Sequence, residues 1–189
     1  MEIYLVFTDT KTPLARLVKT CTQHTYGHVS LSFDPNLETM YSFGRKDVEN
    51  AFVAGFVQED VQNRLFQRAY CAVYRCTVSK KGYWKMWAYV KNMEKQKDLY
   101  KYNLSGLFGV LLQRNFDRKD AFFCSQFVAT VLSEGGIRVS DKPANLVSPR
   151  DIYLAAGLKI VYCGPMNEYP MHKKELFYYE NKRGLMSAL

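Results

Sequence analysis

The segment AFFCSQFVATVLSEGG, residues 121–136, decides how the rest of the chain can be arranged. Its apolar residues recur at helical spacing and Gly135-Gly136 is a strong helix stop, so the segment predicts one helix over Ala121–Glu134. Cys124 lies in the first turn of this helix, in line with the apolar residues that follow it. Spacing alone would make Cys124 a core residue, since buried free cysteines are common.

Two features of the same segment favour a reactive cysteine over a core cysteine. The N-terminus of a helix carries about half a positive charge, which favours a thiolate at Cys124. The polar pair Ser125-Gln126 follows at once, where a purely structural helix start has no special need of it. Ser125 and Gln126 are therefore candidate residues of an oxyanion site or cleft beside the thiol.

A catalytic thiolate needs a base within hydrogen-bonding reach, and the chain offers three histidines. His172 lies in a basic segment and His24 in a predicted loop. His28 begins the alternating segment Gly27–Phe33, which predicts a half-buried strand. A rigid strand fixes an imidazole better than a loop does, so His28 is the predicted base, although an isolated strand histidine is more often structural.

The third residue of a triad would accept a hydrogen bond from the histidine ring. Two neighbouring strand segments predict a hairpin that turns near Asn36, with Ser30 opposite Ser42. Ser42 would then share a face with His28, one diagonal away. Glu38 is the stronger acceptor but lies closer to the turn, so both residues remain candidates.

These segments resemble the permuted branch of the NlpC-type papain-like superfamily, in particular its YiiX-like cysteine peptidases and amidohydrolases. The resemblance covers about residues 1–160 and rests on GHVSL at 27–31, YSFGR at 41–45 and FCSQFV at 123–128. The histidine strand precedes the cysteine helix, which is the order of the permuted branch. The later segment LVSPRD at 146–151 also resembles the one that follows the cysteine helix in that group.

The resemblance implies an α+β, papain-like fold in permuted order, with a small antiparallel sheet or barrel packed against helices. It implies a nucleophile at Cys124, a base at His28 and an acyl-enzyme intermediate on an amide or ester substrate. We expect no metal or other cofactor. Many relatives place Glu, His or Asn at the third position, where Ser42 stands here. A serine can accept the hydrogen bond but cannot balance the charge of an imidazolium.

The order of the predicted elements also indicates an α+β domain, because strands cluster early and helices gather around and after them. No linker divides the chain, so we expect one domain over residues 1–189, with a core over about 1–164 and a basic, aromatic surface segment over 165–189. The predicted strands are Glu2–Phe7, Gly27–Phe33, Thr39–Phe43, Tyr70–Val78 and Lys159–Cys163. The predicted helices are Pro13–Thr20, Tyr83–Lys97, Ala121–Glu134 and one from Ser148 to about Ala156.

Other residues with possible chemistry have a simpler interpretation. Tyr4, in the first predicted strand, is a candidate for the border of the cleft, although most such residues only pack. Trp84 and Trp87 are expected in the core. Cys71 and Cys76 are five residues apart on one strand and so face opposite sides, and the chain shows no zinc-finger spacing, so we expect no metal site.

The chain carries 26 Lys and Arg against 18 Asp and Glu, a net charge of +8 that attracts anions such as nucleic acid, anionic lipid or acidic polymers. No RNA-binding, zinc-finger or helix-turn-helix signature singles out nucleic acid. The start at Met1 has no basic leader, and no apolar run is long enough to span a membrane. A cytoplasmic protein with free thiols is therefore expected, of unspecified oligomeric state.

Three functions follow from these residues. The first is a cysteine peptidase or amidase that acts on a small peptide, amide or acyl substrate. The second is a catalytically weak or inactive module of the same fold that binds an anionic polymer. The third is an acyltransferase or thioesterase that uses the same residues on lipid-like substrates.

Overall fold

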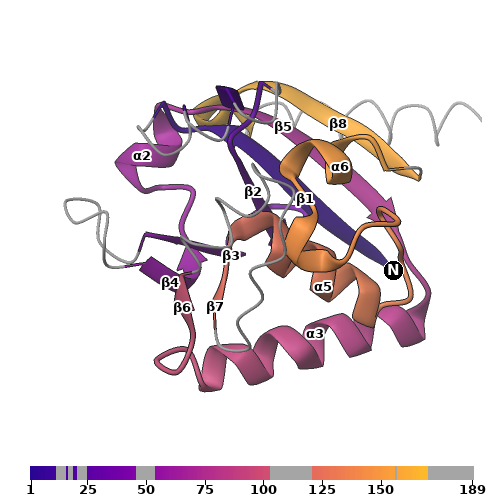
Figure 1. Ribbon diagram of the computed structural model, residues 1–189. Coiled ribbons are helices and arrows are strands. Elements are labelled where there is room, and N and C mark those ends of the chain that lie inside the picture. Colours follow the sequence, from indigo (N-terminus) through magenta and orange to yellow (C-terminus); the bar gives the residue numbers. More distant parts are fainter. Residues whose placement is uncertain are drawn as a thin grey trace, which may run out of the picture.

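The computed structural model describes residues 1–11, 16, 19–20, 25–45, 54–102, 121–155 and 157–169. These residues form an α+β structure around one eight-stranded sheet of order β7-β6-β4-β3-β2-β1-β5-β8 (Figure 1). The six longer strands, from β4 to β8 in that order, pair antiparallel. Their bounds are Glu2–Asp9 (β1), His28–Ser32 (β2), Met40–Arg45 (β3), Ala54–Glu59 (β4), Tyr70–Thr77 (β5) and Leu158–Pro165 (β8).

Two short strands extend the sheet at one edge. β6 (Lys101–Tyr102) pairs with β4, and β7 (Ala121–Phe122) pairs with β6 in parallel. β7 and β8 are therefore the two edges of an open sheet, larger than the small sheet or barrel that the resemblance implied.

Helices cover both faces of this sheet. Helices α3 (Lys80–Lys95), α5 (Cys124–Glu134) and α6 (Pro149–Tyr153) pack on one face, with α5 between the sheet and α3 (Figure 1). The short helix α2 (Arg64–Gln67) and the 3₁₀ turn η2 (Met166–Glu168) cover the other face. A second 3₁₀ turn, η1 (Ala144–Leu146), leads into α6. No helix among the described residues has the length and apolarity that crossing a membrane requires.

The central strand β1 is apolar on both sides because both faces are covered. Leu5 and Phe7 join the core cluster under α5, whereas Val6 points into the cluster under α2 and η2. All three side chains are fully buried. A strand buried on both faces has a continuous apolar sequence, which is what the first segment of the chain shows.

Local signals in the sequence predicted two features correctly. The β2–β3 hairpin turns at Pro35-Asn36 and pairs Leu31 with Tyr41, which is the register that places Ser30 opposite Ser42. Helix α6 begins with the expected serine cap, and Ser148 and Asp151 form a reciprocal capping box.

Several element bounds differ from the sequence-based expectation. Helix α5 begins at Cys124 rather than Ala121, because Phe122 lies in β7 and packs against Phe43 with ring centroids 5.1 Å apart. Packed structure also continues past the expected core limit, since Tyr169 is buried and its hydroxyl donates to the Pro35 carbonyl at 2.8 Å. Strand β4 was not predicted. Most of the predicted helix Pro13–Thr20 lies outside the described residues.

Helix α3 presents a different face to the core than the sequence suggested. Its buried residues are Gly82, Met86, Val90 and Met93, whereas Trp84 and Trp87 are exposed. Gly82 allows α3 to approach α5 closely, since a Cβ atom there would lie 2.5 Å from the carbonyl oxygen of Gly135. The prediction that the two tryptophans lie in the core was wrong.

Candidate active site

The site is centred on His28, the first residue of β2. Its side chain is 15% exposed, and its Nε2 atom lies 2.8 Å from Oε1 of Glu59, the last residue of β4. Strand β3 lies between β2 and β4 in the sheet, so Glu59 reaches across a strand. By the register of the hairpin, Gly44 of β3 stands opposite His28. A Cβ atom at Gly44 would lie 3.5 Å from Glu59 Oε1, an ordinary van der Waals distance, so the carboxylate packs against β3 at this point.

Two buried serines hold the Glu59 carboxylate in place. The Ser42 hydroxyl donates to Oε1 at 2.5 Å, and the Ser30 hydroxyl donates to Oε2. Ser30 Oγ also lies 3.2 Å from His28 Nε2. Both serine side chains are fully buried, so these hydrogen bonds satisfy polar groups that water does not reach. The result is a carboxylate of fixed orientation beside the imidazole.

Cys124 contacts the same imidazole from the start of helix α5. Burial of the ring disfavours its charged form, but the Glu59 carboxylate, the charge of Cys124 and hydrogen bonds to both residues outweigh this effect. Together they raise the pKa of His28 well above its usual value. The His28 imidazole therefore interacts with both the Glu59 carboxylate and the Cys124 thiol.

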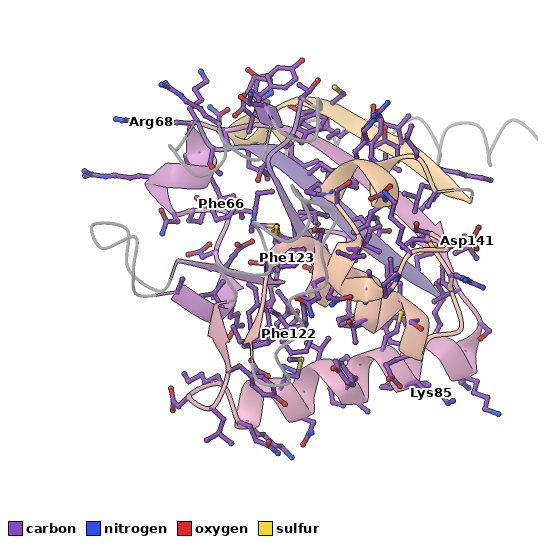
Figure 2. The ribbon with its side chains drawn as sticks, in the orientation of Figure 1. Phe66, Arg68, Lys85, Phe122, Phe123 and Asp141 are labelled. Carbon is purple, nitrogen blue, oxygen red and sulfur yellow. The ribbon has the colours of Figure 1, made fainter. Side chains whose placement is uncertain are left out.

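The start of α5 leaves its first backbone N–H groups without a side-chain cap. The N-cap residue is Phe123, in extended conformation, whose side chain has no acceptor atom. Figure 2 shows Phe123 at the end of the helix that faces the middle of the molecule. Uncapped N–H groups at a helix N-terminus favour a negative charge, so this end of α5 can stabilise both a thiolate and an oxyanion beside Cys124.

Aromatic packing fixes the cysteine helix against the strands that carry the other site residues. The Phe127 ring, one turn after Cys124, packs against Phe43 of β3 at 5.5 Å and Phe56 of β4 at 5.7 Å between centroids. β3 carries Ser42 and β4 carries Glu59. The same core contacts therefore set the position of the helix N-terminus relative to the carboxylate.

The structure brings the two principal predicted residues together but changes the third. Glu59, rather than Ser42 or Glu38, lies against the His28 ring. Ser42 acts on Glu59 instead, through the hydrogen bond described above. Glu38 is exposed in the β2–β3 turn, where its carboxylate accepts a 3.5 Å hydrogen bond from Asn36. A carboxylate at the third position can balance an imidazolium, which the serine could not.

The other predicted residues occupy structural positions or lie elsewhere. The Tyr4 hydroxyl donates to Glu2 at 3.0 Å within the opposite core cluster, and burial followed by that bond raises the pKa of Tyr4 to about 12. Gln126 is buried. It follows Cys124 by two residues, a rotation of about 200° around the helix axis, so the two side chains leave the helix on opposite sides. His24 and His172 lie outside the described residues.

Two buried oxygen atoms have no hydrogen-bond partner within the described part of the chain. They are the hydroxyl of Thr8 and the side-chain carbonyl of Gln126. Thr8 is the direct cross-strand neighbour of His28 in the β1–β2 ladder, a pairing that the sequence analysis did not consider. A buried polar atom without a hydrogen-bond partner is costly to the fold.

Ser125 connects the site to the segment that precedes α6. Its hydroxyl is buried and donates to the Val147 carbonyl at 2.7 Å. We expect Ser125→Ala to lower the free energy of unfolding by about 1–3 kcal/mol, because the carbonyl is left buried without that donor. Chemical denaturation measures the loss, and alkylation of Cys124 should keep its rate. A drop in alkylation with unchanged stability would instead assign Ser125 to the cleft.

No protein-family model matches the chain, and no curated protein shows significant sequence similarity to it. Among the described residues, no group of three or more His, Cys, Asp and Glu side chains is arranged to hold a metal ion. The chemistry of the site is therefore inferred from Cys124, His28 and Glu59 themselves.

Proposed function

We propose that the protein is a cysteine hydrolase with Cys124 as nucleophile and His28 as the proton-transfer residue. Glu59 orients the His28 ring and stabilises its protonated form. One observation carries the proposal: His28 Nε2 lies 2.8 Å from the Glu59 carboxylate, and Cys124 at the start of α5 interacts with the same ring. A nucleophile, a base and a group that orients the base are the recurring arrangement of thiol acyl-transfer enzymes.

The order of the elements supports a papain-like fold in permuted order. The histidine strand β2 precedes the cysteine helix α5 in the chain, and α5 packs on an antiparallel sheet with Cys124 at its first residue. This is the order that the resemblance to the YiiX-like group implies. The proposal differs from that resemblance at the third position, where Glu59 comes from a strand of its own.

In the proposed acylation step, the Cys124 sulfur attacks the carbonyl carbon of an amide or ester. The raised pKa of His28 favours an imidazolium, so the ring holds the proton of the thiol before attack and gives it to the leaving amine or alcohol. The carbonyl oxygen becomes an oxyanion, which the N–H groups at the start of α5 stabilise. The C–N or C–O bond then breaks, and a thioester on Cys124 remains.

In the deacylation step, His28 takes a proton from water, the hydroxide attacks the thioester and the thiolate leaves. A different acceptor in place of water would make the protein an acyltransferase with the same residues. Product analysis separates these outcomes, since only hydrolysis yields the free acid when a peptide amide, a thioester and a phospholipid are compared.

The first test measures thiol reactivity. We expect iodoacetamide at pH 6 to alkylate Cys124, although it is buried, faster than the other described cysteines, because the adjacent His28 ring can take the proton of its thiol. Burial raises the pKa of Cys71 and of Cys76, so both should react slowly. Mass mapping of the modified peptide over time gives the rate for each cysteine.

The control is the exposed thiol of Cys163. Cys163→Ala should leave the fast phase intact, whereas Cys124→Ala should remove it. A wild-type protein in which Cys124 reacts no faster than Cys163 at pH 6 would contradict the proposed activation.

A further inference from the structure

The outer face of helix α3 combines two exposed tryptophans with a set of lysines. Trp84 is 49% exposed and Trp87 is 38% exposed. The 16-residue helix contains five lysines and one glutamate. At 3.6 residues per turn, Lys81, Lys91 and Lys95 share the solvent side with the two indole rings. The core-facing side consists of smaller residues, so folding does not require the tryptophans.

The tryptophan rings are held in position without being buried. Trp84 packs edge-to-face on Tyr83 at 5.5 Å and on Trp87 at 5.8 Å between centroids. The Lys91 ammonium lies 5.9 Å from the Trp87 ring centre and donates to the Tyr41 hydroxyl at 2.8 Å. Ordered, exposed indole rings indicate a surface prepared for a partner, because a solvated helix face gains nothing from them.

The charge on this face is mostly uncompensated. The glutamate, Glu94, pairs with Lys91 at 2.7 Å. Among the described residues, no ion pair engages Lys80, Lys81, Lys85 or Lys95. Figure 2 shows Lys85 pointing away from the body of the molecule below α3. The face therefore attracts an anionic surface, in agreement with the net charge of +8.

We propose that the α3 face docks on an anionic lipid bilayer, with the indole rings of Trp84 and Trp87 at headgroup depth and the lysines against acidic headgroups. Tryptophan prefers this depth because its ring is apolar and its N–H is polar. Lysines beside an anionic leaflet add attraction, and an amphipathic helix lying in the interface plane is a known mode of reversible attachment. The two rings stand 78° apart, so they cannot both stack on successive nucleic acid bases. The inference does not rest on the proposed hydrolase activity.

The chain provides its own reporter, because its two tryptophans are both on this face. We expect their emission to shift to shorter wavelength when the full chain meets vesicles of equal parts phosphatidylcholine and phosphatidylserine. Brominated acyl chains should quench that emission. Vesicles of phosphatidylcholine alone should give little shift, and added salt should reverse binding because it screens the lysines. Unshifted, unquenched emission with the anionic vesicles at low salt would overturn the proposal.

A charge-swap pair tests whether the location matters or only the net charge. Lys81→Glu with Lys95→Glu should weaken vesicle binding about tenfold or more, since each lysine near an anionic surface contributes to attachment. The matched control is Arg68→Glu with Lys159→Glu, which changes the net charge equally at exposed positions on other elements. Figure 2 shows Arg68 at the opposite end of the molecule from Lys85. The control should bind within a few-fold of wild type, and equal losses in both pairs would overturn the assignment to α3.

The aromatic part is tested by Trp84→Ala with Trp87→Ala, followed by vesicle sedimentation instead of fluorescence. Its far-UV circular dichroism and thermal unfolding should match those of the parent, because the rings are exposed. We expect a loss of sedimentation comparable to that of the lysine pair. Undiminished sedimentation would contradict insertion of the indoles. Tight binding of a single-stranded oligonucleotide without binding to vesicles would assign the face to nucleic acid and reject the membrane.

Discussion

Glu59→Gln is expected to slow acylation of Cys124 by about 10⁴-fold, in line with the loss seen when a triad carboxylate becomes an amide. The glutamine keeps the shape of the side chain but removes the negative charge that lies 2.8 Å from His28. Without that charge the pKa of His28 falls, so the ring holds the thiol proton less well and transfers it less often. The burst of nitrophenolate from a nitrophenyl ester measures the acylation rate directly.

Three comparisons make this expectation specific to Glu59. Glu38→Gln should leave the burst unchanged, because Glu38 is exposed in a turn. Ser42→Ala should lower the rate by only about tenfold, the value of one hydrogen bond to a charged group, since Ser30 still holds the carboxylate. The pH profile of alkylation should move to higher pH in Glu59→Gln alone. A Glu59→Gln variant with a normal burst and a normal pH profile would show that the carboxylate only supports the fold.

Local patterns in the sequence predicted the parts of the fold that local forces determine. The hairpin register follows from the turn at Asn36, and the capping box at Ser148 fixes the start of α6. The start of α5 could not be predicted this way. Phe122 has the same apolar character as the helix that follows. Its pairing with Tyr102 of β6 and its contact with Phe43, which are both non-local, make it part of a strand.

The missing third residue has a related cause. Glu59 ends β4, whose buried and exposed positions do not alternate regularly, so no periodic signal marked this strand. The carboxylate reaches His28 across β3, which lies between β2 and β4 in the sheet. Such a contact involves three strands of the sheet and is not marked by a local sequence pattern. A search limited to the hairpin therefore found Ser42, which hydrogen-bonds to the actual partner.

The tryptophans of α3 show that a large apolar side chain does not by itself identify the buried face of a helix. Trp84 and Trp87 are the largest apolar side chains of the helix, and they were expected in the core. The close approach of Gly82 to Gly135 leaves little depth between α3 and α5, and Met86 fills it. The two indole rings are therefore too large for the interface between α3 and α5.

The His28–Glu59 pair should also stabilise the fold, and His28→Gln should lower the free energy of unfolding by about 3 kcal/mol near pH 6. The variant leaves the Glu59 carboxylate, only 8% exposed, without its cationic partner. The double variant His28→Gln with Glu59→Gln should recover part of the loss, because it removes the unpaired charge as well. Chemical denaturation of the three variants and the parent gives the coupling between the two residues.

The pH dependence of this contribution has a defined sign. Folding raises the pKa of His28 above its ordinary value of 6.5, so the folded chain binds the proton more tightly than the unfolded chain. The stabilisation is therefore complete below about pH 6.5 and is lost as the pH rises through the folded pKa. The difference in unfolding free energy between the parent and His28→Gln should shrink steadily from pH 6 to pH 9. A difference that grows with pH would mean that the ring is buried in its neutral form, and a neutral ring could not hold the proton that the proposed thiolate gives up.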